Sequence, residues 1–522
     1  MGDQSSGIKN VVVVGGGTAG WLTACVIGAE FESGSDGISV TLVESPDTPT
    51  IGVGEGTWPS MRSTLKKIGI SETTLLRQCG ASLKQGTHFK QWQYQRDNDC
   101  YYHPFSEPKG FGELNIAEHW LSRANREEPF AHTVTAQSML CDLDSAPKQL
   151  GVPEYSYILN YGYHLDAGRF ANLLAEHATK NLNVLHLQAH INEVLSGDDG
   201  DVIGLRARTG EVIAGDLFID CTGFESLLLS NHYNIPLIPV SKYLFNDRAI
   251  AVQVPYENGA QAINSTTLST AQRAGWIWDI GLRDRRGVGY VHSQEHTNGD
   301  EAFQDLNNYL LATGRRGGLK GLEPRVINFR SGYRETFWHK NCVAVGLSAG
   351  FVEPLEASAL VLIELSARAI ADNLPRDRSV MATIAARFND NFRSRWEQIV
   401  DFLKLHYVLS KREDSAYWLE NRAESSIPTR LLEKLADWRY RAPWHIDQRQ
   451  TDELFPAASY QYVLYGMGFE TTVRTDRRLR QQELDRADQL LAEVKEEGIK
   501  LMQHLPTNRV LLQQIYERAF AG

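Results

Sequence analysis

Three glycines near the start of the chain have the spacing that lets a backbone approach a phosphate. Gly15, Gly17 and Gly20 form the pattern G-x-G-x-x-G. In this pattern the first glycine allows a tight turn, the second admits a pyrophosphate, and the third lets a helix pack closely on the preceding strand. The helix that follows points its N-terminal N–H groups at the negative charge. The pattern predicts that the chain binds a dinucleotide.

The flanking segments fit this interpretation better than a coincidental glycine turn. The β-branched run at 11–14 is typical of a buried parallel strand. We expect an apolar helix over 18–31 and a second strand over 38–43. Glu44 follows that strand, where a carboxylate can accept a hydrogen bond from a ribose hydroxyl. Together these segments predict the βαβ start of a nucleotide-binding domain.

Two later segments, 214–223 and 341–346, repeat the order of a buried strand and a glycine turn. They predict one nucleotide domain built from discontinuous pieces of the chain. The first of them resembles the second FAD-contacting strand of flavoprotein monooxygenases. Residues 52–59 add a further glycine-rich loop, which includes Gly54. Because NAD alone would not require these extra turns, we predict FAD as the cofactor.

The inserted and C-terminal segments show two other periodicities. Trp276 and Trp278 are two residues apart on an expected strand, 276–280, so both rings face one side of a sheet as a rigid wall without acid or base. Alternation over 250–254 and an apolar stretch over 263–268 predict further strands of an antiparallel sheet. Helical spacing dominates 359–373, 381–407 and 483–501.

We therefore predict the α/β class, with an FAD-binding Rossmann-like domain of the glutathione-reductase and monooxygenase type. It carries an inserted antiparallel sheet and a largely helical C-terminal region. The predicted FAD-binding domain comprises residues 1–90, 155–230 and 325–375. The predicted substrate-binding region comprises 91–154, 231–324 and 376–522.

Composition narrows the class of protein. The formal net charge of −11 argues against nucleic acid as a partner. The sequence shows no long apolar run and no signal peptide, so we expect no membrane association and a cytoplasmic location. Its 6 cysteines have neither metal-ligand nor disulfide-framework spacing, so we expect no metal site and reduced, buried thiols.

Five features occur together and in order, and as a set they are specific. The chain is similar to flavin-dependent halogenases of the tryptophan-halogenase type over about residues 8–420. The features are Gly15–Gly20 with Trp21, the 52–59 loop, Lys84 in Ala-Ser-Leu-Lys, Trp276-x-Trp278-x-Ile280, and Glu353-Pro-Leu-Glu356.

The resemblance implies a division of labour. A separate NAD(P)H-dependent flavin reductase supplies reduced FAD, which with O2 and a halide ion yields hypohalous acid. Lys84 carries or hydrogen-bonds this oxidant beside a small aromatic substrate, and Glu356 assists the lysine or accepts the ring proton. Burial suits this role because it lowers the pKa of a lysine toward its neutral amine.

The remaining residue roles also follow from the resemblance. Trp276 and Trp278 lie beside the flavin, His103 and Phe105 stack on the substrate, and Ser358 and Ala359 bind the halide. The expected FAD contacts are Gly15, Gly17, Thr18, Ala19, Gly20, Glu44, Gly54, Gly223, Leu347 and Leu360. A homodimer is plausible for the family, and we interpret His88 and His164 as structural.

The chain departs from the family pattern in three places. Gly281 replaces the proline of Trp-x-Trp-x-Ile-Pro, and Glu356-Ala357-Ser358-Ala359 replaces Glu-Ser-Thr-Gly. The second change leads us to expect a preference for bromide over chloride, because the larger ion loses less hydration on entry. The tail lacks a match to the residues that enclose free tryptophan, so we expect a more open site for an indole-like ring.

Two other functions remain open from the sequence. The main alternative is a flavin-dependent aromatic monooxygenase that hydroxylates its substrate, against which Lys84 and the paired tryptophans argue. The other is a flavin-binding protein without halide chemistry. The altered segment 357–359 is the only feature that supports this alternative.

Overall fold

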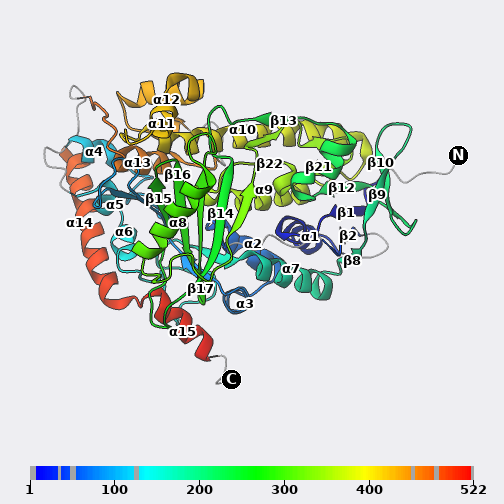
Figure 1. Cartoon of the computed structure of the whole chain (residues 1–522), viewed down its shortest axis with the longest axis horizontal. Coiled ribbons are helices and arrows are strands. Elements are labelled where there is room, and N and C mark those ends of the chain that lie inside the picture. Colours follow the sequence, from blue (N-terminus) through cyan, green and yellow to red (C-terminus); the bar gives the residue numbers. More distant parts are fainter. Residues whose placement is uncertain are drawn as a thin grey trace. The chain divides into compact units, whose positions relative to one another are not determined.

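The chain divides into two compact units, each built from three separate segments. The computed structural model describes residues 7–32, 37–47, 54–122, 128–447, 453–474 and 481–518. The first unit comprises Met1–Ala81, Leu165–Val240 and Arg330–Trp396, and the second comprises Ser82–His164, Ser241–Phe329 and Glu397–Gly522. Figure 1 labels their helices and strands.

The first unit contains the predicted Rossmann-like sheet. Its strand order is β20-β21-β12-β1-β2-β8, and all neighbouring pairs are parallel except β20 with β21. The strands are β1 (Asn10–Val14), β2 (Ser39–Glu44), β8 (Leu185–Gln188), β12 (Leu217–Asp220), β20 (Trp338–His339) and β21 (Cys342–Ala344). Val14, Asp220 and Ala344 are aligned across three strands. The turns that follow these strands therefore meet at one edge of the sheet.

Helices and two small sheets complete this unit. The helix α1 (Thr18–Glu30) is buried at Thr18 and from Gly20 to Ile27, and it contacts both α7 (Ala167–Asn181) and α9 (Ser358–Asp372). The helices α2 (Ser60–Ile68) and α3 (Glu72–Gln78) follow β3 (Gly54–Gly56). The small sheets contain β9 (Ile191–Ser196), β10 (Val202–Ala207) and β11 (Val212–Ala214), and β13 (Leu237–Pro239), β19 (Gly332–Arg334) and β22 (Gly350–Phe351).

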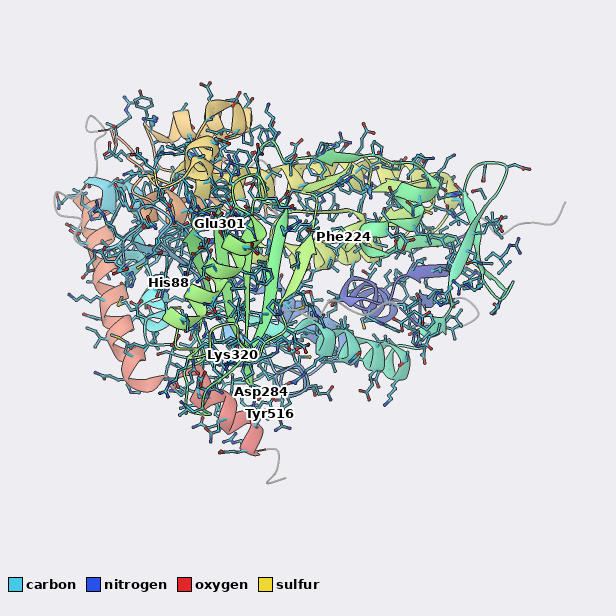
Figure 2. All side chains as sticks on the ribbon, viewed as in Figure 1. His88, Phe224, Asp284, Glu301, Lys320 and Tyr516 are labelled. Atoms are coloured by element: carbon cyan, nitrogen blue, oxygen red, sulfur yellow. The ribbon has the colours of Figure 1, made fainter. Side chains whose placement is uncertain are left out.

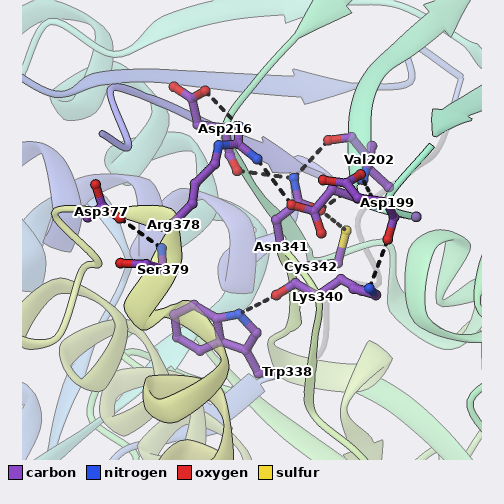
Figure 3. A network of polar contacts seen from close by, with 12 residues as sticks. Asp199, Val202, Asp216, Trp338, Lys340, Asn341, Cys342, Asp377, Arg378 and Ser379 are labelled. Atoms are coloured by element: carbon purple, nitrogen blue, oxygen red, sulfur yellow. Dashed lines mark hydrogen bonds and ion pairs between the residues drawn. The ribbon is translucent and has the colours of Figure 1, made fainter. Parts of the chain in front are cut away.

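Polar side chains join the small sheet of β9, β10 and β11 to the six-stranded sheet (Figure 3). The Asn341 amide group donates to the Val202 carbonyl at 2.7 Å and accepts from the Val202 N–H at 2.9 Å. Arg378 pairs with both Asp201 and Asp216. The Asp216 carboxylate also accepts from the Asn10 N–H at 2.8 Å. Asp216 therefore supports the amino end of β1, away from the glycine turn.

The second unit is organised around a seven-stranded sheet of order β18-β14-β17-β16-β15-β5-β6. Its strands are β5 (Gly86–Lys90), β6 (Cys100–Pro104), β14 (Arg248–Pro255), β15 (Thr267–Gln272), β16 (Gly275–Gly281), β17 (Arg285–His292) and β18 (Arg325–Asn328). The predicted antiparallel sheet is confirmed, although β15 pairs in parallel with β5. The strand expected over 263–268 was placed too early, because only its last two residues belong to β15.

The two faces of β16 have different neighbours. Ile277 packs into an apolar cluster with α8 (Gly299–Ala312), and Asp279 forms a buried ion pair with Arg286 and accepts from the Tyr309 hydroxyl at 3.0 Å. Trp276 and Trp278 alternate to the opposite face, with their ring centroids 6.4 Å apart. Both rings are buried, and the strand that carries them is held by the contacts of Ile277 and Asp279 on its other face.

The C-terminal region is helical, as predicted. It contains α10 (Met381–Val408), α11 (Ala416–Asn421), α12 (Thr429–Trp438), α13 (Ala457–Gly466), α14 (Gln481–His504) and α15 (Asn508–Arg518). In Figure 1, α14 runs in red beside α4 (Ile116–Ser122), α5 (Phe130–Val134) and α6 (Ala136–Cys141), which it contacts. Within the described ranges, no helix is long and apolar enough to cross a membrane. All cysteines are free, but Cys100 is exposed at the start of β6, so the expectation of buried thiols was wrong there.

We expect Gly289→Ala to destabilise the protein. Gly289 lies opposite Trp278 in the sheet, and an added Cβ would sit 2.1 Å from the Trp278 ring. Forcing this atom into a filled core should lower the free energy of unfolding by about 1–3 kcal/mol. Urea unfolding followed by tryptophan fluorescence measures the change. Gly112→Ala is the control, since its Cβ would meet nothing within 4 Å; equal stability of the two variants would contradict the packing argument.

Candidate functional site

The glycine turn after β1 is closed on one side and open on the other. Gly15 has φ 116°, and a Cβ there would lie 2.3 Å from the Cys221 carbonyl oxygen. A Cβ on Gly20 would lie 1.9 Å from the Gly15 carbonyl oxygen, whereas one on Gly17 would meet nothing within 4 Å. Two glycines therefore permit close packing, and the middle one leaves space for a ligand.

The start of α1 suits the phosphates of a dinucleotide. Gly17 is the N-cap without a side-chain cap, and the first turn, which begins with Thr18 and Ala19, carries no acidic residue. Its N–H groups and the helix dipole favour an anion. Glu44 ends β2, and its carboxylate lies against this turn. A Cβ added to Gly16 would fall 1.5 Å from a carboxylate oxygen of Glu44. These residues fit the pyrophosphate and ribose of FAD.

The other predicted flavin contacts lie on neighbouring turns and helices of the first unit. Gly223 has φ 70° in the turn after β12, and Leu347 follows β21 next to Gly346. A Cβ on Gly346 would lie 2.8 Å from Cβ of Ala19, so this turn packs against the start of α1. Leu360 is buried in α9 and Gly54 begins β3. Residues 52 and 53 of the predicted loop lie outside the described residues.

Asp220 is a site residue that the sequence analysis missed. Its buried carboxylate accepts from the N–H groups of Leu228 and Leu229 at 2.8 and 3.1 Å, and from the Thr222 hydroxyl at 2.6 Å. It thereby fixes the turn that carries Gly223. An acidic residue at the end of a fully apolar strand was the available signal.

Lys84 is buried in the second unit beside an aromatic ring. It ends β4 (Ser82–Lys84), which pairs with β7 (Gly162–Asp166), and only 1% of its surface is exposed. Its Nζ lies 5.4 Å from the centroid of the Phe105 ring. Phe105 is held there because its N–H donates to the Gln85 carbonyl at 3.0 Å. The structure thus brings together a predicted catalytic residue and a predicted substrate contact.

The three histidines of the second unit that the sequence analysis named have defined neighbours. His103 shares a 3.0 Å hydrogen bond with the Ser459 hydroxyl, and its ring centroid lies 5.6 Å from that of Phe402. His164 bonds the Thr267 hydroxyl at 2.8 Å, while burial and then the nearby Lys84 lower its pKa. His88 stacks on Tyr102 at 4.0 Å. For His88 and His164, a structural role remains the prediction.

Asn508 at the start of α15 holds the residue next to Lys84. Its side-chain amide donates to the Leu83 carbonyl at 2.9 Å, and its side-chain oxygen accepts from the Leu83 N–H at 3.4 Å. The Ser82 hydroxyl donates to the carbonyl of Gly281 at 2.5 Å. The strand that carries Lys84 is therefore fixed by residues hundreds of positions away, which no local pattern could indicate.

The segment Glu356–Ala359 lies in the first unit, at the start of α9. Glu356 is buried and belongs to a short 3₁₀ turn that ends at Ala357. Ser358 and Ala359 form the first turn of the helix, whose N-cap, Ala357, makes no side-chain cap. The carbonyl of Glu356 accepts from the indole N–H of Trp58 at 2.8 Å.

Two acidic side chains of the first unit are held largely away from water. Burial raises the pKa of Glu364, on α9, to about 7, although it accepts hydrogen bonds from Ser60 at 3.1 Å and Thr64 at 2.7 Å. Burial, together with the Asp166 carboxylate, raises the pKa of Glu55 to about 7. Both groups therefore change charge near neutral pH.

A separate cleft of about 600 Å³ lies in the second unit. Its lining includes Tyr256, Asp284, Arg509 and Tyr516, and Figure 2 shows Asp284 and Tyr516 close to each other. The cleft contains none of the predicted site residues. In the part of the chain that the structure describes, no group of three or more His, Cys, Asp or Glu side chains could hold a metal ion.

We expect Asn508→Ala to lower the free energy of unfolding by about 1–3 kcal/mol, because it leaves buried backbone groups of Leu83 without their side-chain partner. Chemical denaturation measures the loss. Asn373→Ala removes an exposed hydrogen bond from the Asn373 side-chain amide to the Ala369 carbonyl at the end of α9. It should change the free energy of unfolding by less than about 0.5 kcal/mol. A similar small effect of both substitutions would show that the Leu83 contacts contribute little.

We expect the stability of the wild type to fall more steeply between pH 5 and 7.5 than that of Glu364→Gln. The folded-state pKa of Glu364 is raised from 4.5 to about 7, so its contribution to stability is present below pH 4.5 and is lost as the pH rises through 7. Arg368 is the charged neighbour that opposes the shift. Melting temperatures across this range test the difference; parallel curves would refute the shift.

Comparison with known proteins extends the likeness to nearly the whole chain. The model of the tryptophan halogenase family matches residues 10–482. The chain is 30% identical to the tryptophan 6-halogenase ThaL of Streptomyces albogriseolus, over 98% of this chain and 99% of that protein. It is 29% identical to the tryptophan 7-halogenase RebH of Lentzea aerocolonigenes, over 99% of this chain and all of that protein.

Solved structures agree in fold. A tryptophan halogenase from Shewanella frigidimarina matches with a TM-score of 0.95 and 46% identity, over 99% of both chains. BrvH, a flavin-dependent halogenase from Brevundimonas, matches with a TM-score of 0.84 and 31% identity, over 98% of this chain and all of that one. The likeness thus continues past residue 420, where we expected it to weaken. This chain belongs to the tryptophan halogenase family, and it is a flavin-dependent halogenase.

Proposed function

We propose that the chain uses reduced FAD, O2 and a halide to halogenate an electron-rich, indole-like ring, with Lys84 presenting the halogen electrophile. The observation that carries this proposal is the burial of Lys84 beside Phe105. An amine removed from water is more easily neutral, and only the neutral amine can take up a halogen from hypohalous acid. The ring of Phe105 offers an apolar surface on which an aromatic substrate can lie.

We assign FAD to the edge where the three glycine turns meet. Gly15, Gly17 and Gly20 with Glu44 would hold the pyrophosphate and ribose, and the turns at Gly223 and Leu347 would contact the rest of the cofactor. When bound in reduced form, the flavin supplies the activation of O2 that oxidises the halide. The paired tryptophans, Trp276 and Trp278, would exclude substrate from the flavin and so oppose hydroxylation.

The halide is assigned to the start of α9. The N–H groups of Ser358 and Ala359 lie at a helix N-terminus without a side-chain cap, where an anion is favoured. Apart from the Ser358 hydroxyl, the site offers an ion only backbone N–H groups to replace its hydration shell. We therefore infer a preference for bromide, which loses less hydration than chloride.

Glu356 is assigned as the acceptor of the ring proton, or as the group that supports the Lys84 amine. Its carboxylate is buried, and its backbone is fixed through Trp58. Removing the proton from the halogenated carbon restores the aromatic ring, so a carboxylate held near the substrate speeds the last step.

The substrate and the partners are assigned more broadly. The names of relatives specify tryptophan, so tryptophan is one candidate beside indole and its derivatives. His103 and Phe105 would contact this ring. A separate NAD(P)H-dependent flavin reductase supplies the reduced cofactor, while a homodimer and a cytoplasmic location remain predictions.

Mass spectrometry of products tests the proposal. The enzyme is supplied with FAD, NADH, a flavin reductase, O2, indole or tryptophan, and either bromide or chloride. We expect a halogen isotope pattern, more product with bromide, and a loss of at least about 100-fold in Lys84→Met with FAD binding unchanged. Lys320→Ala, at an exposed lysine, is the matched control and should retain full activity.

Other outcomes would contradict separate parts of the proposal. Hydroxylated product, or NADH oxidation without the reductase, would identify an aromatic monooxygenase. Equal or greater turnover with chloride would overturn the halide preference alone. Halogenation that survives in Lys84→Met would overturn the role of the lysine.

A further inference from the structure

Two successive residues before α9 have a backbone conformation that amino acids with side chains rarely adopt. Glu356 has φ 64° and ψ 8°, and Ala357 has φ 54° and ψ 44°. Left-handed angles cost roughly 1–2 kcal/mol for each residue with a Cβ. Such a turn persists only where its surroundings hold it in place.

Trp58 supplies one of these constraints. Its indole N–H donates to the Glu356 carbonyl at 2.8 Å, across 298 positions of sequence. Within the turn, the Ala357 N–H donates to the Pro354 carbonyl at 3.0 Å. The indole bond therefore ties the turn to the segment between β3 and α2, rather than to its own chain neighbours.

Glu364 supplies the second constraint, because it fixes α2 on α9. Its two carboxylate oxygens accept from the hydroxyls of Ser60 and Thr64, both on α2. Only 3% of its surface is exposed, so water competes little for these bonds. The helix α2 begins two residues after Trp58. The hydrogen bonds that hold α2 to Glu364 therefore also restrict where the Trp58 indole can lie.

The turn controls the direction of the N–H groups that follow it. Ala357 is left-handed and Ser358 is right-handed, with φ −77° and ψ −14° for Ser358. Successive residues of opposite hand turn their N–H groups toward the same side and form a concave anion site. A shift of Ala357 to right-handed angles would remove this concavity and rotate the Glu356 side chain.

We propose that Trp58 and Glu364 are positioning residues that hold the Glu356–Ala357 turn, and thereby the Glu356 carboxylate and the halide-facing N–H groups of Ser358 and Ala359. This inference rests on the proposed function of the same segment. Neither Trp58 nor Glu364 needs to touch the halide, since both act through the backbone of the turn.

A double-mutant cycle between Trp58→Phe and Ala357→Gly tests the inference. Phenylalanine keeps an aromatic ring but lacks the N–H, and glycine adopts left-handed angles without a penalty. We expect Trp58→Phe to raise the bromide KM roughly tenfold, with a smaller change in kcat. In Trp58→Phe/Ala357→Gly the KM should return to within about twofold of Ala357→Gly alone, because the turn no longer needs the indole bond.

A binding measurement accompanies the kinetics. Bromide-dependent increases in melting temperature, with sulfate at equal ionic strength as reference, should weaken in Trp58→Phe and recover in the double variant. FAD affinity is measured for every variant to show that the nucleotide site is intact. Thr64→Val, which removes one donor to Glu364 at nearly constant volume, is the second variant and should raise the bromide KM in the same direction.

The outcomes separate the inference from the proposed function. An unchanged bromide KM in Trp58→Phe and Thr64→Val would overturn the inference. A raised KM that Ala357→Gly does not rescue would show that Trp58 acts by packing alone, which also overturns it. Absence of halogenated product in the wild type would instead refute the proposed function, while the bromide-dependent melting shifts would still test the turn.

Discussion

Burial of the Lys84 amine is the constraint around which the second unit is arranged. A lysine side chain taken out of water loses the hydration of its charged form, so its pKa falls unless charged neighbours oppose the change. The protein keeps Lys84 buried because β4, although only three residues long, is held at several points. It pairs with β7, Ser82 bonds Gly281, and Asn508 bonds both backbone groups of Leu83. These contacts fix the backbone on both sides of the peptide that precedes Lys84, which ends the strand beside the Phe105 ring.

Buried acids play the corresponding role elsewhere in the molecule. Asp220 fixes a turn by accepting backbone N–H groups, and Asp279 fixes a strand through Arg286 and Tyr309. Glu364 differs from both, because its donors are two hydroxyl groups and its pKa is raised to about 7. The charge of Glu364 therefore varies near neutral pH, so the strength of the α2–α9 contact depends on pH.

Local patterns in the sequence predicted the elements well, and the reason is physical. The glycine turns, the β-branched strands and the alternating tryptophans all depend on neighbours within a few positions. The error at 263–268 arose because Ile263 is fully buried without belonging to a strand, so an apolar residue indicated burial but not pairing. Asn508 and Trp58 escaped notice because an amide or an indole N–H carries no local sign of its partner. Their partners lie 425 and 298 positions away.

The structure also changes which departure from the family pattern deserves weight. In the altered segment Glu356-Ala357-Ser358-Ala359, alanine at position 359 replaces the glycine of the family pattern. Ala359 lies within α9, where alanine is favoured over glycine by about 1 kcal/mol. That replacement is compatible with the helix and stabilises its first turn. The strained position is Ala357, which has left-handed angles without being glycine. The backbone strain of this altered segment therefore lies at residues 356 and 357, in a turn held from outside by the indole N–H of Trp58.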